Sequence, residues 1–325
     1  MNDSTEAFAA RIRERFPEGL TGVFAVGGTR TSYILETQRQ QNDIGNIDDF
    51  QDYANLGFDK YLELISLFRA YGGKHAIISP LSFQSFYERG PDYAALISRY
   101  TLYLIDEKSL SFYHHHRLAP YFAGIDTLLK LSSDHPGHEL GAKLAEFQTQ
   151  HSFPAEWGRL VWEIAPIPLY TFWKASREFW NDPQLVERLE SETDLYALHD
   201  ELYRLYSKAA YGQALPMPHF YVGSSRNGDL KPRSMFPLAM SCGGPMRLFY
   251  LPYPSLLMTA DTLREILENL AFGKPVLHSR RVDYTGQVTR ELAEAEYNHY
   301  LTLAADPQTT LGLYRSMNPS DGQQT

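Results

Sequence analysis

Six short apolar runs, separated by longer stretches with helical spacing, constrain the fold of this 325-residue chain more than any other feature. Apolar strands that alternate with amphipathic helices are typical of α/β folds, because each parallel strand needs a crossover to return the chain. We therefore expect a central, largely parallel six-stranded sheet flanked by helices. The expected strands are residues 22–26, 76–78, 118–124, 159–164, 220–222 and 247–250.

Helices are expected between these runs because apolar residues recur there every three or four positions. The clearest case begins near residue 261, where Thr262 and Glu265 have the spacing of a capping box. The expected helices are residues 5–16, 53–68, 91–104, 169–211 with an interruption near Pro183, and 261–271.

The chain contains no internal repeat, no low-complexity linker and no break in composition that would divide it. Hydrophobic residues make up 43% of the sequence, which is ample for a core. We therefore expect one domain over residues 1–325. It would include an N-terminal helix within residues 1–20 and a frayed polar tail at residues 318–325.

The charge and cysteine content exclude several classes of partner and location. A net charge of −9 argues against nucleic acid, because phosphate backbones require a basic face. The single cysteine provides no disulfide framework, and the acidic N-terminus is unlike a signal peptide. No apolar run approaches the roughly 20 residues of a membrane span. We therefore expect a cytoplasmic protein.

Two loops with similar residues follow the first and fifth expected strands. Residues 27–30 read Gly-Gly-Thr-Arg, and residues 223–226 read Gly-Ser-Ser-Arg, with a further arginine at Arg233. Ligands of open α/β sheets gather at the carboxyl ends of strands, where backbone amides can face an anion. Arginine adds a bidentate fork. A glycine pair alone is most often a tight turn, but the two loops together predict a diphosphate site.

An acidic cluster lies about twenty residues after the first turn, at Asp48, Asp49 and Asp52. This spacing lets carboxylates share Mg²⁺ with a substrate diphosphate. Equally, acidic residues at the start of a helix complement its dipole. All-helical terpene synthases have the same spacing, but they need a second metal motif; the nearest match here, Asn181-Asp182, runs directly into Pro183. The expected strands also argue against an all-helical bundle.

Aromatic residues reach 14% of the chain, with 22 Tyr and 18 Phe. They can form an aromatic core, or they can line a cavity whose ring faces suit an apolar or cationic ligand. The run His114-His115-His116 invites a metal site, but successive histidines point in different directions. No carboxylate or cysteine accompanies them nearby, so a polar or partly buried cluster is expected instead.

The chain resembles the cis-prenyltransferase superfamily, and more narrowly its terpene-processing branch of bacterial diterpene synthases and transferases. The resemblance covers roughly residues 20–125 and 215–290 and is weak between them. It depends on the glycine turn after the first strand and on several short motifs. These motifs are Ile78-Ser79-Pro80, residues 88–93, residues 110–113, residues 247–250, Thr259, residues 262–264 and residues 283–284.

This resemblance implies a hydrophobic tunnel for an isoprenoid diphosphate, a homodimer and the use of Mg²⁺. It implies release of diphosphate to give an allylic cation, which water, another nucleophile or proton loss then quenches. Tyr53 falls on the catalytic tyrosine of the terpene branch. The diphosphate-binding residues that the resemblance implies are Gly28, Thr29, Arg30, Arg89, Arg226 and Arg233.

Two positions depart from the pattern of the family. The aspartate that precedes the phosphate-binding turn is Gly27 here, and a second arginine of the terpene branch is Thr31. Our hypothesis is that Asp48, Asp49 or Asp52 takes over the carboxylate role, both in catalysis and in binding Mg²⁺.

The sequence therefore predicts a terpene synthase or prenyl transferase that ionises an isoprenoid diphosphate of 15 or 20 carbons, either linear or already cyclised. Two alternatives remain open. A non-catalytic partner subunit of a cis-prenyltransferase would account for the loss of the aspartate at Gly27. A chain-elongating cis-prenyltransferase would use that missing carboxylate, and residues 85–89 lack the polar residue that elongation uses.

Overall fold

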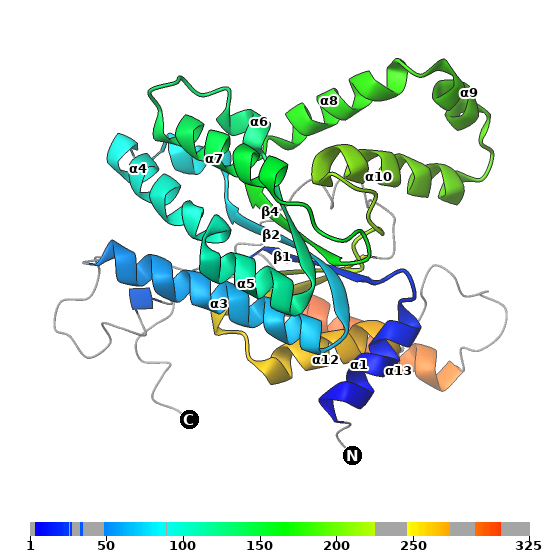
Figure 1. The fold of residues 1–325 in the computed structure, drawn as a ribbon. Helices are drawn as coiled ribbons and strands as arrows, with labels where there is room; N and C mark the ends of the chain where they lie inside the picture. The colour runs from blue at the N-terminus through cyan, green and yellow to red at the C-terminus, as the bar shows by residue number, and fades with distance from the viewer. Residues whose placement is uncertain are drawn as a thin grey trace.

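The protein is built around one six-stranded sheet with helices on both sides (Figure 1). The structure is a computed structural model that describes residues 4–25, 27, 33–34, 49–88, 90–224, 246–273 and 290–306. Every strand pairing in it is parallel, in the order β3-β4-β2-β1-β5-β6, which confirms the expected fold class. The strands are β1 Leu20–Ala25, β2 Gly73–Leu81, β3 Leu118–Ala123, β4 Gly158–Ile164, β5 Phe220–Ser224 and β6 Arg247–Leu251.

Side chains of the central strands alternate between two buried layers, because successive residues of a strand point to opposite faces. In β1, Phe24 belongs to the larger apolar cluster and Val23 to the smaller one. In β4, Trp162 and Val161 divide in the same way. Burial on both faces explains why these strands are continuous apolar runs in the sequence.

Most of the helices cover the face that holds the larger cluster, and α8 and α10 cover the opposite face. The first group consists of α1 Thr5–Arg15, α3 Phe50–Ala70, α4 Gly90–Thr101, α5 Glu107–His116, α7 Pro136–Gln150 and α12 Ala260–Phe272. The second consists of α8 Pro168–Trp180 and α10 Leu195–Tyr211, joined by α9 Pro183–Ser191. Short turns are η1 Phe83–Phe86, η2 Leu102–Ile105, α6 Ile125–Leu128 and η4 Ser255–Leu257.

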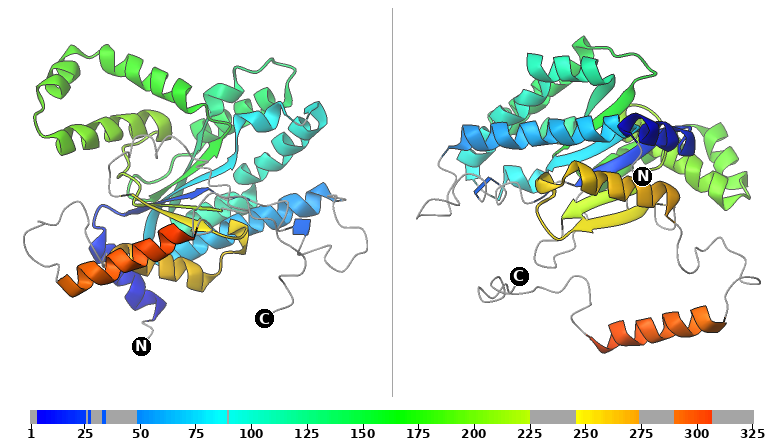
Figure 2. Two further views of the ribbon diagram at one scale, coloured as in Figure 1. Left: turned by 180° about the vertical axis from the view of Figure 1, so that it is seen from behind. Right: turned by 90° about the horizontal axis from the view of Figure 1, so that it is seen from below.

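Helices α8, α9 and α10 form an arm that projects beyond the sheet (Figures 1 and 2). The interruption expected near Pro183 is confirmed, since α9 begins there and the carboxylate of Asp182 caps it. A last helix, α13 Arg290–Ala305, has exposed side chains wherever they are described. In the described part of the chain, no helix is both long and apolar enough to cross a membrane.

Two local predictions were wrong in detail. Helix α12 is capped by Thr259, whose hydroxyl accepts the N–H of Thr262, so the cap lies three residues before the expected capping box. Strand β2 continues past Ile78 to Leu81, although Ser79 and Pro80 were expected to end it. The pairing with β4 shifts register between Ile78 and Leu81, which accommodates the proline in the strand.

Candidate active site

An aromatic cavity lies at the carboxyl end of β2, between the first half of α3 and helix α4. Its volume is about 140 Å³, and no charged residue is among the described residues that line it. The strand contributes Pro80 and Leu81, its last two residues. Seven of the lining residues are aromatic: Phe50, Tyr53, Phe58, Tyr61, Tyr93, Tyr100 and Trp162.

Phe50, in the first turn of α3, joins the two helical walls of this cavity. Its ring centroid lies 5.3 Å from that of Tyr53, 6.0 Å from Tyr93 and 5.5 Å from Tyr100. Tyr53 also contacts the buried ring of Tyr33 at 5.5 Å. The packing of one ring against rings from both helices fixes the distance between α3 and α4.

Trp162 forms the back wall of the cavity. It is fully buried on β4, and its indole N–H donates to the hydroxyl of Tyr113 at 3.1 Å. That hydroxyl donates to the carbonyl of Leu104 at 2.7 Å, and burial raises the pKa of Tyr113 well above its ordinary value. Tyr113 therefore remains protonated and holds the indole in one orientation.

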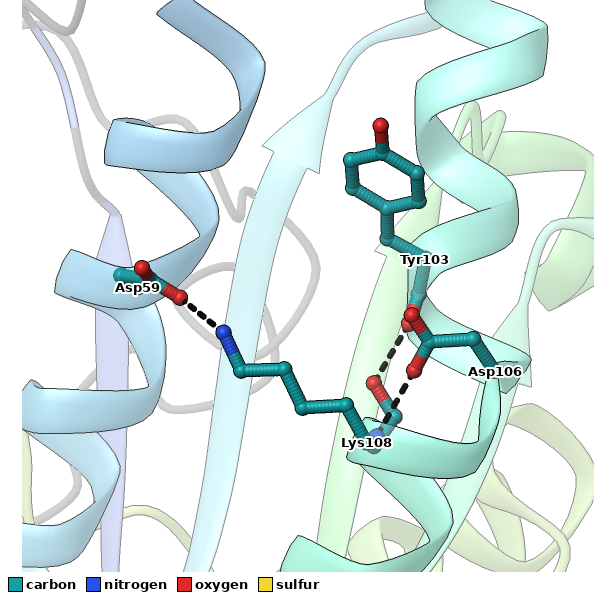
Figure 3. A network of polar contacts seen from close by, with 5 residues as sticks. Asp59, Tyr103, Asp106 and Lys108 are labelled. Atoms are coloured by element: carbon teal, nitrogen blue, oxygen red, sulfur yellow. Dashed lines mark hydrogen bonds and ion pairs between the residues drawn. The ribbon is translucent and has the colours of Figure 1, made fainter. Parts of the chain in front are cut away.

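A polar network below the cavity ties α5 to α3 and to η2 (Figure 3). Lys108 on α5 pairs with Asp59 on α3 at 2.5 Å. The hydroxyl of Ser109 donates to the carbonyl of Tyr103 at 2.5 Å, and Asp106 caps α5 by accepting the N–H of Ser109 at 2.8 Å. The network positions Tyr103, whose ring contacts the cavity residue Tyr100.

Gly27 lies two residues after the last residue of β1 and is hydrogen-bonded to a distant segment of the chain. Its N–H donates to the hydroxyl of Ser255 at 3.0 Å, and its carbonyl accepts the N–H of Ser255 at 3.3 Å. Strand β1 lies between β2 and β5, and Ala25 pairs with Gly223. The two loops that the sequence assigns to diphosphate binding therefore leave neighbouring strands at the same edge of the sheet.

The predicted site residues divide into two groups. Tyr53 lies on the wall of the aromatic cavity, next to Phe50 and Tyr33, and its catalytic role stays a prediction. Asp49 and Asp52 begin α3, close by in the chain. The other predicted residues lie outside the described part of the chain: Gly28, Thr29, Arg30, Asp48, Arg89, Arg226 and Arg233.

The described acidic residues do not by themselves form a metal site. Asp49 is the N-cap of α3, and one of its carboxylate oxygens accepts the N–H groups of Gln51 at 2.8 Å and Asp52 at 3.0 Å. Both carboxylates are exposed, and no group of three or more His, Cys, Asp or Glu suitable for a metal exists among the described residues. Binding of Mg²⁺ stays a prediction that needs ligands beyond these two side chains.

Sequence reasoning missed a buried carboxylate on the opposite face of the sheet. Glu163 follows Trp162 on β4 and is only 5% exposed. It accepts hydrogen bonds from the hydroxyls of Ser79 and, at 3.2 Å, of Tyr211. Burial and the negative charge of Glu163 raise the pKa of neighbouring Tyr203. The signal was available, because a glutamate inside an otherwise apolar strand needs buried donors.

Solved structures with similarity to this chain include two diphosphate synthases. No protein-family model matches the chain, and no curated protein matches it in sequence. Lavandulyl diphosphate synthase from Lavandula x intermedia, solved with dimethylallyl diphosphate, is 11% identical with a TM-score of 0.48; the match covers 78% of this chain and 96% of that one. A probable undecaprenyl diphosphate synthase from Campylobacter jejuni is 11% identical with a TM-score of 0.47, covering 82% and 97%. Neither similarity assigns a substrate or a reaction to the present chain.

Proposed function

We propose that this protein is an enzyme that ionises an isoprenoid diphosphate and directs the resulting allylic cation to a product. The observation that carries the proposal is the neutral cavity with seven aromatic side chains at the carboxyl edge of the sheet. Ring faces attract a cation by roughly 0.5–2 kcal/mol each without forming a bond to it. A wall of this kind stabilises a carbocation and offers no nucleophile strong enough to end the reaction early.

The bond that breaks joins the allylic carbon to the diphosphate oxygen, and its electron pair leaves with the diphosphate. Stabilisation of that leaving group requires cations or amide donors at the mouth of the cavity. The sequence supplies candidates in Arg30, Arg226 and Arg233. Their loops follow the adjacent strands β1 and β5, which supports a shared cradle.

Tyr53 has a suitable position for the second half of the reaction. It lies on the cavity wall in the first turns of α3, close to the chain segment that carries the acidic cluster. A tyrosine hydroxyl at such a wall can orient water, or it can take a proton from the cation while it passes its own proton to water or to the released diphosphate. We therefore assign to Tyr53 the capture or deprotonation step.

The size of the cavity sharpens the substrate prediction. A volume near 140 Å³ is close to the roughly 150 Å³ at which an apolar protein cavity binds benzene. That space can hold the reacting end of an isoprenoid substrate but not all of its 15 or 20 carbons. In the proposal the aromatic cavity surrounds the allylic carbons, and the remaining chain extends outside it or requires the cavity to widen on binding.

The proposal includes the homodimer that the resemblance implies. The arm formed by α8, α9 and α10 exposes large apolar side chains that a second copy could cover; they include Leu169, Trp173, Trp180, Leu195 and Tyr196. Sedimentation equilibrium of the full chain tests this part, and a monomer at all concentrations contradicts it.

The function is tested by incubating purified protein with farnesyl, geranylgeranyl and cyclised 20-carbon diphosphates, with and without Mg²⁺. Diphosphate release is followed directly, and products are identified by gas chromatography with mass spectrometry. We expect release from at least one substrate, loss of turnover in Arg30→Ala, and altered products in Tyr53→Phe. The matched control Tyr87→Phe changes an exposed ring outside the cavity and leaves products unchanged. No release from any substrate contradicts the proposal.

One described feature favours the alternative of a non-catalytic partner subunit. Gly27 stands where the resemblance expects an aspartate, and both of its backbone groups are bound to Ser255. A partner subunit would bind prenyl diphosphate without releasing diphosphate from it. Adding isopentenyl diphosphate to the same assay tests the other alternative, a chain-elongating cis-prenyltransferase. Such an enzyme then gives longer products.

A further inference from the structure

A second cavity lies at the opposite, amino-terminal edge of the sheet. Its volume is about 700 Å³, and its floor is formed where strands begin, by Gly73 of β2 and Gly158 of β4. At Gly158 an added Cβ would lie 2.1 Å from the carbonyl oxygen of Lys74, so no larger residue fits there. Cavities of a few hundred to about 1,000 Å³ are the usual size for small-molecule ligands.

Four basic side chains line this cavity and come from four separate elements. They are Arg13 of α1, Arg69 of α3, Lys74 of β2 and Arg117, the C-cap of α5. The only acidic residue among the described lining residues is the exposed Glu156. No ion pair involves Arg13, Lys74 or Arg117 within the described residues, so the cavity carries an excess of positive charge there.

Arg69 differs from the other three basic residues because its guanidinium is already hydrogen-bonded to backbone carbonyls. It donates to the carbonyls of Gly73 at 2.8 Å and His116 at 3.1 Å. Burial lowers the pKa of Arg69, and the nearby charges of Arg13 and Arg117 lower it further. Arg69 therefore feels the positive charges of both Arg13 and Arg117, which line the same cavity, and an anion bound there would relieve that repulsion.

Helix dipoles account for part of this arrangement but not for all of it. Arg13 and Arg69 lie in the last turns of their helices, where a cation is favoured. Arg117, in contrast, has a left-handed backbone with φ of 51°, a conformation that glycine or asparagine adopts more easily at a helix end. The helix dipole alone does not explain why an arginine has this strained backbone and lines the same cavity as Arg13.

The cavity also has an aromatic wall. Trp157 lines it and packs against His114, whose ring centroid lies 5.3 Å away. Phe16, the C-cap of α1, also lines it. His114 belongs to the histidine run noted in the sequence. Its ring supports the indole, and among the described residues it belongs to no group that could hold a metal.

We propose that this cavity binds a phosphate-bearing small molecule with an aromatic or apolar portion, at a site separate from the proposed active site. Arg13, Lys74 and Arg117 hold the phosphate, since guanidinium groups form bidentate hydrogen bonds to phosphate oxygens. Trp157 and Phe16 contact the rest of the ligand. Helix α3 spans both sites, with Phe50 at one end and Arg69 at the other, roughly 30 Å apart.

The test uses inorganic phosphate and adenosine 5′-monophosphate as probes, with chloride at matched ionic strength as the reference. Binding is measured by isothermal titration calorimetry on the full chain. We expect saturable binding of each probe at this cavity, with the nucleotide bound more tightly. Arg13→Ala and Arg117→Ala each weaken both probes by about tenfold or more, which corresponds to one charge-assisted hydrogen bond. Trp157→Leu removes the advantage of the nucleotide and keeps phosphate binding.

Two control variants make the result specific. Arg188→Ala removes an arginine that also lies in the last turn of a helix, is paired with Glu201 at 2.7 Å and is outside the cavity; it leaves both affinities unchanged. Arg30→Ala removes a residue of the proposed diphosphate cradle and also leaves them unchanged. No binding in the parent protein, an equal loss in Arg188→Ala, or a loss in Arg30→Ala but not Arg117→Ala overturns the proposal.

Discussion

The two ends of helix α3 border cavities that are chemically opposite. At its amino end, the aromatic cavity has no charged residue in its described lining, and its shape is set by ring-to-ring packing between α3, α4 and β4. At its carboxyl end, the cationic cavity has four basic residues in its lining, and Arg69 links its walls through backbone carbonyls. The first is a space for an apolar or cationic group, and the second is a space for an anion.

This difference shows that position at the edge of the sheet does not by itself define what is bound. The expectation of anion binding at the carboxyl edge depends on the loops after β1 and β5, whose arginines lie outside the described residues. Four basic residues that the structure describes lie instead around a cavity where strands begin, beside the carboxyl ends of α1 and α3. In our two proposals, ionisation of the substrate and binding of a second anion take place at opposite edges of the sheet.

The largest effect is expected at the aromatic cavity, from Trp162→Ala. The indole is fully buried and packs in the main apolar cluster, so its removal should lower the free energy of unfolding by about 3–5 kcal/mol. Tyr87→Ala, at a ring that is 64% exposed, should change it by less than about 1 kcal/mol. Denaturation in urea measures both. A similar small change in the two variants would mean that the cavity wall is not part of the core.

The sequence could predict features that depend on local patterns of burial, but not those that depend on how distant elements pack together. The six strands were predicted because burial on both faces makes apolar runs, and the helices because their buried faces repeat every three or four residues. The helices over residues 53–68 and 91–104, which carry the tyrosines of the aromatic cavity, were both predicted. Their convergence on one cavity depends on how α3 packs against α4, which no local pattern encodes.

The cationic cavity was not predicted for a related reason. Arg13, Arg69 and Arg117 are separated by about fifty residues each, and each lies in the last turn or at the C-cap of a helix of ordinary appearance. Only the parallel sheet brings the carboxyl ends of their helices to one edge. Glu163, in contrast, lay inside a predicted strand, and its charge in an apolar run was a usable signal.

A second prediction separates Arg69, which is hydrogen-bonded to the backbone, from the three other basic residues of the cationic cavity, which form no ion pair within the described residues. Arg69→Met removes the donor to the carbonyls of Gly73 and His116, so we expect a loss of about 2–4 kcal/mol in the free energy of unfolding. Arg117→Ala removes only an exposed, repelling charge and should change it by less than about 0.5 kcal/mol. Equal losses in urea denaturation would mean that the cationic cavity is held by both arginines alike.

The smallest expected effect, measured per pH unit, is a pH dependence of the free energy of unfolding that arises at the amino-terminal edge of the sheet. The buried ring of His75 accepts the N–H of Arg159 at Nδ1, 3.0 Å away, and burial, followed by the charge of Lys74, lowers its pKa to about 3. Burial also lowers the pKa of His219, whose Nδ1 accepts the N–H of Thr21 at 3.1 Å. Both histidines therefore favour their neutral form in the folded protein.

Because the folded pKa of His75 is depressed, its contribution to stability is complete above pH 6.5, the ordinary value for histidine in the unfolded chain. Between pH 6.5 and about 3 the unfolded chain binds a proton that the folded protein does not, so the free energy of unfolding falls as pH falls. The slope reaches about 1.4 kcal/mol per pH unit for one group. His75→Asn keeps an acceptor near Nδ1 and should flatten this slope, whereas His115→Asn, at an exposed histidine of α5, should not.

Hydrogen exchange at decreasing pH locates the effect. Amides at the start of β2 and in Arg159 should lose protection first, while those of α4, beside the aromatic cavity, keep theirs. The physical reason is that the described lining of the aromatic cavity contains no carboxylate, histidine or lysine that titrates in this range. Simultaneous loss of protection at both edges would show that the two cavities, joined by α3, unfold as one cooperative unit. The cavities would then differ in the chemistry of their walls but not in local stability.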